Sequence, residues 1–383
     1  DSSFGLGDMA VLALATAPNW ERGETMFAAT TEGVFISRNG GRAWRETDLM
    51  MDDDAIDVLA VSPAFDQDRT VFAASEGGDL YRSADGGRRW ELLQKGLGEG
   101  PVNCLWLAPD YADSGRVVAG VGSQILVSSN SGDSWQVGAN MPGSILALAG
   151  DSKVLLVGMH DAGIQTSVDG GMTWAPVEGF ASRGFARLVT NDGKLYAMGP
   201  QEGLLFSQDG GESWQSIDSL LSYLPVSAIS LPADGGLYVA SQEAGMVRST
   251  DGGESWEVVC DEPGVQALLV LPEAGAGWAG TGQGKMLVSR DGGRAWKKID
   301  SPCEGQEIVS IAASPSYVDD HTLLMGTAKA AVGAQQGRVA LWRSTNGGET
   351  WRQLTTQVTP ARWVDIQMPL GVIKDAASQA VVG

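Results

Sequence analysis

The sequence has few of the residues that most catalytic and metal sites require. Only two histidines occur in 383 residues, His160 and His321, which excludes a His-rich metal site. A Ser-His-Asp triad would have to use one of them, and both fall in predicted hairpin loops. The three cysteines, Cys104, Cys260 and Cys303, lack C-x-x-C spacing. We expect buried free thiols, with a Cys260–Cys303 disulfide as the alternative, and neither a metal ion nor a cofactor.

Basic residues are scarce: the chain has 26 basic and 47 acidic residues, so its net charge is −21. Nucleic acids and anionic membranes attract cationic surfaces, so we expect neither as a partner. No run of 18 or more apolar residues occurs, so no membrane insertion is expected. No signal peptide is recognisable, but a chain that begins at Asp1 could have lost one. Cytoplasmic and exported locations therefore both stay open.

What the sequence does contain is an eight-residue motif, here called the box, that occurs eight times. It reads Ser-x-Asp/Asn-Gly-Gly-x-x-Trp, and only the third copy departs from it, with Ser131 in place of the first glycine. Successive box tryptophans are 46, 45, 39, 40, 42, 40 and 55 residues apart. Such a period, combined with short strands, is typical of a propeller.

Each repeat contains four short strand candidates and no ten-residue helical pattern. In the second repeat they lie at 57–63, 70–74, 80–83 and 90–93. The sequence therefore predicts an all-β, eight-bladed β-propeller of four-stranded antiparallel blades within residues 1–360. The expected blades are 8–48, 55–94, 101–138, 144–178, 185–218, 226–260, 265–300 and 307–356. Residues 361–383 resemble the start of a further repeat or a closing segment, so part of a nine- or ten-bladed propeller is the alternative.

The box itself is predicted to be a structural hairpin between the third and fourth strands. Gly-Gly supplies backbone conformations closed to other residues, and the Asp or Asn accepts backbone N–H groups of its own turn. The Trp covers apolar surface while its N–H finds a partner. A metal role is disfavoured because Asn replaces Asp in three boxes. The structural residues are Asn39, Trp44, Asp85, Trp90, Asn130, Trp135, Asp169, Trp174, Asp209, Trp214, Asp251, Trp256, Asp291, Trp296, Asn346 and Trp351.

These boxes resemble the Asp-box, or BNR, repeats of sialidases, the sortilin luminal domain and propeller-type photosystem II assembly factors. The resemblance covers about residues 8 to 360 and implies a WD40/YVTN/BNR-like propeller. It says little about function, because enzymes and binding proteins share the box. Sialidases need three converging arginines, and here only Arg183, Arg187 and Arg362 lie in or just before innermost strands, while most others lie in box hairpins or outer strands. We therefore expect a member without sialidase activity.

Carboxylates on the loops between second and third strands leave a glycosidase as an alternative. One such residue occurs in each of five blades, and solvated polar loops are the expected explanation. They are Glu32, Asp79, Asp161, Glu202 and Glu243. The acidic run Asp52-Asp53-Asp54 with Asp57 is likewise expected to be a solvated loop, with a calcium site as the alternative.

Large apolar residues on loops that join one blade to the next are the candidate partner-binding residues. Exposed apolar groups rimmed by acids mark interaction surfaces, although these side chains could also fold inward as plugs. They are Met50, Met51, Phe180, Phe185, Leu221 and Tyr223. The sequence thus predicts a non-catalytic propeller scaffold for protein–protein interaction, a subunit or assembly factor of a larger complex. A glycan-binding or glycoside hydrolase propeller is the alternative.

Overall fold

The computed structural model describes most of the chain. The described residues are 11–18, 25–41, 43–51, 54–180, 183–185, 187–191, 194–199, 203–216, 226–232, 234–241, 243, 245–314, 317–329, 337–358 and 365–367.

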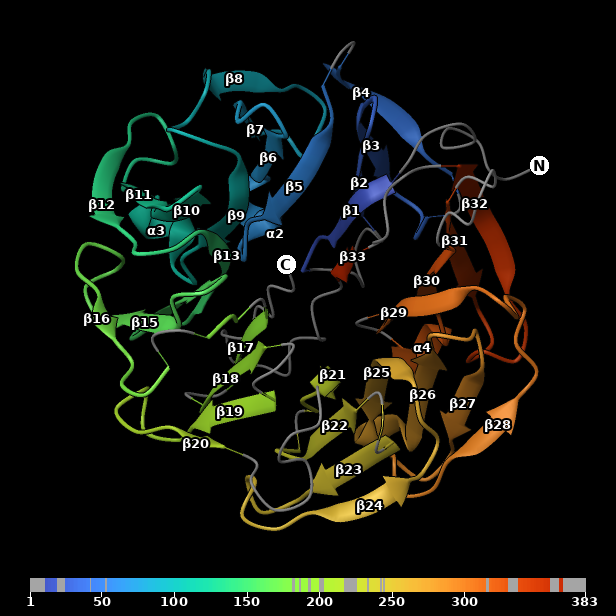
Figure 1. The fold of residues 1–383 in the computed structure, drawn as a ribbon. Coiled ribbons are helices and arrows are strands. Elements are labelled where there is room, and N and C mark those ends of the chain that lie inside the picture. Colours follow the sequence, from blue (N-terminus) through green and yellow to red (C-terminus); the bar gives the residue numbers. More distant parts are fainter. Residues whose placement is uncertain are drawn as a thin grey trace. The chain divides into compact units, whose positions relative to one another are not determined.

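The fold is all-β, an eight-bladed β-propeller of antiparallel sheets, which confirms the fold class predicted from the repeat. Within each blade the four strands are hydrogen-bonded in chain order, as Figure 1 shows for β5 to β8. A further short strand, β33, lies at Asp365–Gln367.

The chain forms two compact bodies, one mainly of blades 1 to 5 and the other mainly of blades 6 to 8. The strands of the first body are β1 (Val11–Thr16), β2 (Met26–Thr30), β3 (Gly33–Ser37), β4 (Arg45–Met50), β5 (Ile56–Val61), β6 (Val71–Ser75), β7 (Leu80–Ser83), β8 (Glu91–Gln94), β9 (Val102–Leu107), β10 (Val117–Val121), β11 (Gln124–Ser128), β12 (Gln136–Asn140), β13 (Ile145–Gly150), β14 (Leu155–Met159), β15 (Ile164–Ser167), β16 (Ala175–Pro176), β17 (Arg187–Asn191), β18 (Lys194–Gly199), β19 (Gly203–Ser207) and β20 (Gln215–Ser216).

The strands of the second body are β21 (Val226–Ser230), β22 (Leu237–Ser241), β23 (Gly245–Ser249), β24 (Glu257–Cys260), β25 (Val265–Leu271), β26 (Ala276–Thr281), β27 (Met286–Ser289), β28 (Lys297–Ile299), β29 (Glu307–Ala313), β30 (Leu323–Lys329), β31 (Arg338–Ser344) and β32 (Arg352–Val358).

Burial follows the order of strands within a blade. The second strand β6, Val-Phe-Ala-Ala-Ser, is buried at every position, because sheets pack on both of its faces. The fourth strand β8, Glu-Leu-Leu-Gln, is largely exposed at the outer edge of the same blade. A register shift interrupts the pairing of β8 with β7 between Leu80 and Tyr81, and such bulges discourage edge-to-edge aggregation.

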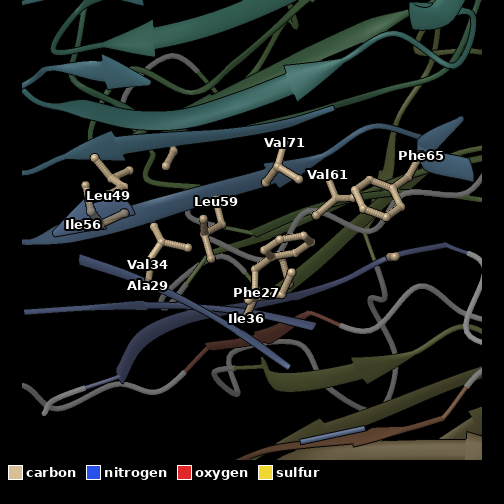
Figure 2. Packing of buried hydrophobic residues seen from close by; sticks show 13 residues of the cluster. Phe27, Ala29, Val34, Ile36, Leu49, Ile56, Leu59, Val61, Phe65 and Val71 are labelled. Carbon is tan, nitrogen blue, oxygen red and sulfur yellow. The ribbon is translucent and has the colours of Figure 1, made fainter. Parts of the chain in front are cut away.

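Blades are held together by apolar clusters that fill the space between neighbouring sheets. Between blades 1 and 2 the cluster takes Phe27, Val34 and Leu49 from one blade and Leu59 and Phe65 from the next (Figure 2). At about 25 cal/mol per Å² of buried apolar surface, this packing rather than strand propensity supplies most of the blade-to-blade stability.

Among the described residues, three long connections between first and second strands contain a single helical turn: α2 (Phe65–Asp68), α3 (Tyr111–Ser114) and α4 (Tyr317–Asp320). A 3-10 turn, η1 (Pro272–Ala274), replaces it in blade 7. The first residue of each α-turn packs edge-on against an aromatic residue of the preceding blade. The ring pairs and centroid distances are Phe27–Phe65 at 5.8 Å, Phe72–Tyr111 at 6.0 Å and Trp278–Tyr317 at 5.0 Å. No helix among the described residues has the length and apolar character to cross a bilayer.

Candidate interaction site

The box forms a turn in which the serine and the Asp or Asn share their hydrogen bonds. In blade 2, the Ser83 hydroxyl donates to Asp85 Oδ1 over 3.0 Å and accepts the N–H of Gly87 over 2.8 Å. Asp85 Oδ1 also accepts the N–H groups of Arg88 and Arg89, each at 2.9 Å. The serine-to-Asp/Asn bond is present in all eight boxes. The polar groups of the box are therefore engaged in holding its own turn.

The box tryptophans are not equivalent. Five of them donate the indole N–H to the carbonyl of the second box glycine: Trp135, Trp174, Trp214, Trp256 and Trp296. The indole nitrogens of Trp44, Trp90 and Trp351 are buried and have no hydrogen-bond partner among the described residues. The expectation of a partner for every indole is therefore wrong in these three boxes, where apolar packing dominates.

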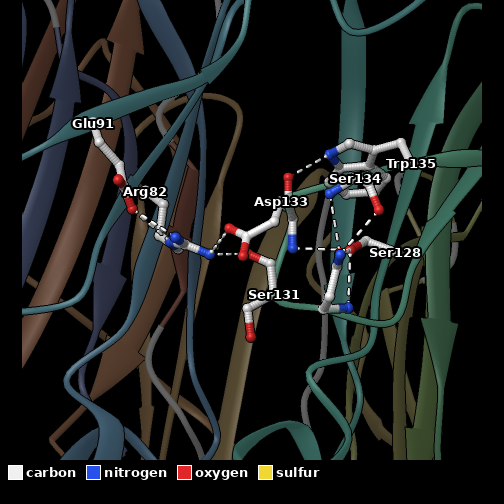
Figure 3. A network of polar contacts seen from close by, with 9 residues as sticks. Arg82, Glu91, Ser128, Ser131, Asp133, Ser134 and Trp135 are labelled. Atoms are coloured by element: carbon white, nitrogen blue, oxygen red, sulfur yellow. Dashed lines mark hydrogen bonds and ion pairs between the residues drawn. The ribbon is translucent and has the colours of Figure 1, made fainter.

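One ion pair and one hydrogen bond from Arg82 connect blade 2 to the box of blade 3, as Figure 3 shows. The Arg82 guanidinium lies 2.7 Å from Glu91 within its own blade and 2.8 Å from Asp133 in the next box. It also donates to the Ser131 carbonyl. The Arg82 guanidinium thus binds one carboxylate of its own blade, and a carboxylate and a backbone oxygen of the next blade.

Hydrogen bonds hold the pKa of several box carboxyl groups below the usual range. Asp209 accepts the Ser213 hydroxyl, the Ser213 N–H and the Ser207 hydroxyl, which lower its pKa to about 2. At Asp169 burial alone would raise the pKa, but bonds from Thr173 and Ser167 outweigh it and lower the value to about 2. These carboxylates stay ionised well into the acid range.

Acid sensitivity of folding follows from this lowered pKa. A carboxyl whose pKa falls on folding contributes stability above its unfolded pKa, near 3.9, that is lost as pH drops through the folded value. We expect Asp209→Asn, which matches the Asn of boxes 1, 3 and 8, to fold and to lose less thermal stability than wild type between pH 4 and pH 2. The measurement is the melting temperature across that range.

The matched variant is Ser213→Ala, which keeps the carboxylate but removes its strongest hydrogen-bond donor. Its acid-induced loss of stability should move to higher pH than in wild type. Identical pH profiles for all three proteins would contradict the assigned role of Asp209.

The ends of the strands define two edges for each blade. We call the edge where the third strand ends and the fourth begins the box edge, and the opposite edge, where blades are joined, the loop edge. Because strands alternate in direction, β5 begins, β6 ends, β7 begins and β8 ends at the loop edge of blade 2.

The predicted partner-binding residues fall into three groups. Met50 ends β4 opposite Gly33 and is 41% exposed, so it is available at the loop edge of blade 1. Met51 packs against the cluster between blades 1 and 2, and its N–H donates to the Glu32 carbonyl at 2.8 Å. Phe180 packs against the cluster that contains the fully buried Phe185, with ring centroids 6.1 Å apart.

Phe185 therefore does not reach the surface. Met51 and Phe180 are partly buried and pack against the apolar clusters between blades. The sequence alone could not distinguish these roles, because a loop residue has no periodicity to indicate which way it points. Leu221 and Tyr223 lie outside the described residues.

Four acidic residues gather at the loop edge of blade 2, and we call them the acidic cluster: Asp54, Asp57, Glu76 and Asp79. Asp54 accepts the N–H groups of Ala55 and Gly77, and Asp79 accepts that of Gly96 at 2.8 Å. Asp57 lies at the start of β5 with a buried Oδ1 that has no partner among the described residues. Burial, reinforced by the charges of Glu76 and Asp54, raises the pKa of Asp57 to about 7.

The remaining predicted carboxylates do not join this cluster. Glu32, Asp161 and Glu243 lie in separate turns of blades 1, 4 and 6, and Glu202 lies outside the described residues. No group of three or more His, Cys, Asp or Glu side chains arranged to hold a metal ion occurs in the described part of the chain.

Of the three arginines considered for carboxylate recognition, only Arg183 has a described side chain, and its guanidinium lies 5.5 Å from the centre of the Phe180 ring. The side chain of Arg187 and the whole of Arg362 lie outside the described part of the chain. All three cysteines are free thiols: Cys104 and Cys303 are buried, and Cys260 is half-buried, so the alternative Cys260–Cys303 disulfide is absent. Burial raises the pKa of Cys104 to about 12.

Comparisons with known proteins place the chain among β-propellers. A family model described as DUF6242 beta propeller domain matches residues 177–365. No curated protein sequence matches the chain.

Several solved structures share the fold at low sequence identity. The computationally designed Ika8 protein is 13% identical, with a TM-score of 0.60 over 85% of this chain and 95% of that one. YCF48 bound to D1 peptide is 15% identical, with a TM-score of 0.51 over 87% of this chain and 90% of that one. YCF48 from Cyanidioschyzon merolae is 16% identical, with a TM-score of 0.48 over 88% and 93%. Similarity at this level concerns the fold alone.

Proposed function

We propose that this chain is a non-catalytic β-propeller that binds a protein partner at the loop edge of blades 1 and 2, as a subunit or assembly factor. The observation that carries the proposal is the exposed Met50 at the loop edge of blade 1, four residues before Asp54 of the acidic cluster. A flexible thioether and a group of carboxylates at the loop edge of adjacent blades suit a partner segment with apolar and basic side chains. The fold is compatible with this role, since YCF48, a propeller of similar fold, has been solved with a D1 peptide bound.

Met50→Asp tests this proposal, because it replaces the exposed apolar side chain at the loop edge of blade 1 with a charge. We expect it to weaken binding of the native partner about tenfold or more. The matched control is Val168→Asp, since Val168 is 80% exposed but lies in the box turn of blade 4. The measurement is co-purification followed by affinity determination with the recovered partner, with melting temperatures as the check on folding.

A partner retained equally by wild type, Met50→Asp and Val168→Asp would contradict the assigned surface. Recovery of the native protein as a monomer without any partner would contradict the proposed function itself.

One observation favours glycoside hydrolysis as a second candidate. A carboxyl with a pKa of about 7 among other carboxylates is typical of a general acid, and Asp57 has this property. Turnover of an oligosaccharide panel by wild type, abolished in Asp57→Asn, would favour this second candidate over the binding role.

A further inference from the structure

Four arginines from blades 1 and 2 meet at the box edge, opposite the acidic cluster. Arg38 directly follows β3 and Arg45 begins β4, while Arg69 follows α2 and Arg88 lies in the second box. We call these four residues the arginine cluster. They are spread over 50 residues of the chain, and each lies at the box edge of its blade.

Two of the four side chains converge on Gly86, the first glycine of the second box. Arg38 Nη2 donates to the Gly86 carbonyl over 3.1 Å, and the Gly86 N–H donates to the Arg69 carbonyl over 2.9 Å. A Cβ atom at Gly86 would lie 3.9 Å from Arg69 Cδ and 4.0 Å from Arg38 Nη2. The Arg69 guanidinium also lies over the Phe65 ring, 5.4 Å from its centre, which limits its freedom.

Within the described part of the chain, no carboxylate forms an ion pair with the arginine cluster. Burial lowers the pKa of Arg38, and the charges of Arg88, Arg69 and Arg45 lower it further, while Asp85 opposes them. None of the four guanidinium groups lies within ion-pair distance of a carboxylate belonging to a described residue. Asp85 is occupied by the Ser83 hydroxyl and by two backbone N–H groups of its own turn.

Three arginines among the described residues, Arg82, Arg248 and Arg290, do form ion pairs. Arg82 contacts Glu91 and Asp133, and Arg248 contacts Glu257 at 2.8 Å. The chain contains 47 acidic residues, so a shortage of carboxylates does not explain why the cluster lacks ion pairs with described residues. Like charges held together without counter-charges destabilise a fold, and such an arrangement is typical of a site that receives its counter-charge from a ligand.

We propose that the arginine cluster binds an anionic segment of a protein, through carboxylate or phosphate groups. Guanidinium groups bind both oxyanions with paired hydrogen bonds. Arg69 and Arg88 are exposed to a ligand, while contacts with Gly86 and the Phe65 ring hold Arg38 and Arg69 in place. The net charge of −21 does not prevent this, because at physiological salt charges beyond about 8 Å are largely screened. This inference deepens the proposed function and rests on it, since it concerns what a protein partner presents to the opposite edge of the same blades.

The direct test is fluorescence anisotropy with labelled hexaglutamate at about 50 mM and about 200 mM NaCl, a range over which screening of exposed charges changes markedly. We expect saturable binding that weakens at the higher salt concentration, and no binding of labelled hexaglutamine. A peptide of the same length with two phosphoserines distinguishes phosphate from carboxylate as the preferred group. Inorganic phosphate as competitor distinguishes a free ion from a peptide-borne one.

Two variants connect binding to the cluster. Arg69 has φ +56°, a left-handed conformation that Asn tolerates well, so Arg69→Asn removes the charge without backbone strain. Arg88→Gln removes the second exposed charge. We expect each variant to raise the Kd about 3- to 10-fold, and melting temperatures to stay equal to or rise above wild type because repulsion is relieved. The matched control is Arg294→Gln, which occupies the position of Arg88 in the seventh box and should leave the Kd unchanged.

The inference would be overturned if neither anionic peptide bound at the lower salt concentration, if inorganic phosphate bound but the peptides did not, or if Arg69→Asn and Arg88→Gln bound like Arg294→Gln. Met50→Asp distinguishes failure of the arginine site from failure of the proposed function. This variant should bind hexaglutamate as wild type does, but should lose a partner that binds at the loop edge. Partner loss in Met50→Asp with no effect of the arginine variants would leave the proposed function standing and overturn the arginine site.

Discussion

Gly293→Ala is expected to lower the free energy of unfolding by about 2–5 kcal/mol. Gly293 is the second glycine of the seventh box, where the backbone conformation disfavours any residue with a Cβ and no space is left for a side chain. Its φ is +85°, and an added Cβ would lie 2.5 Å from Cε1 of Tyr238 in the preceding blade. Tyr238 cannot move away, since it is fully buried and its hydroxyl donates to the Gly292 carbonyl at 2.7 Å. Urea denaturation of the purified variant measures the change.

Gly210→Ala provides the matched control within the same motif. Gly210 is the first glycine of the fifth box, with φ +75° and no atom of a described residue within 4 Å of an added Cβ. Its substitution should cost only the conformational term of about 1–2 kcal/mol. Equal losses at both positions would show that packing against the preceding blade does not matter.

Trp278→Ala is expected to lower the free energy of unfolding by about 3–5 kcal/mol. Trp278 is 1% exposed, lies 5.0 Å from the Tyr317 ring, and donates its indole N–H to the Gly347 carbonyl at 3.1 Å. Truncation would leave a cavity between blades 7 and 8 and an unpaired carbonyl at the eighth box. The melting temperature and urea midpoint both report the loss.

Trp278→Phe separates the two contributions, since it keeps an aromatic ring but removes the N–H donor. We expect it to lose about 1–2 kcal/mol. A loss as large as that of Trp278→Ala would assign most of the effect to the hydrogen bond and contradict packing as the main source of stability at this position.

The fold class could be predicted because its evidence is contained in short contiguous segments. Ser-x-Asp/Asn-Gly-Gly forms a turn from its own hydrogen bonds, so eight copies at a period near 40 residues indicate eight blades before any contact is known. The helical turns that begin at Phe65, Tyr111 and Tyr317 were not predicted. Their rings pack against residues of the preceding blade, and four-residue turns carry no periodic signal.

The candidate site was predictable only in part. Met50 and Met51 are adjacent in sequence, yet one is exposed and the other packs between blades. Asp57 was expected to be solvated, whereas in the structure its Oδ1 is buried and burial raises its pKa to about 7. Both outcomes depend on which neighbouring sheet covers a given atom, and no local pattern contains that information.

By itself, the sequence determined the repeat, the box turns and the all-β propeller, because each follows from residues a few positions apart. Only the tertiary structure decided that Arg38, Arg45, Arg69 and Arg88 share one edge while four carboxylates share the opposite one. Distances between residues of different blades depend on how sheets pack side by side. That packing is set by apolar clusters such as the one between Phe27 and Phe65, not by the spacing of charges along the chain.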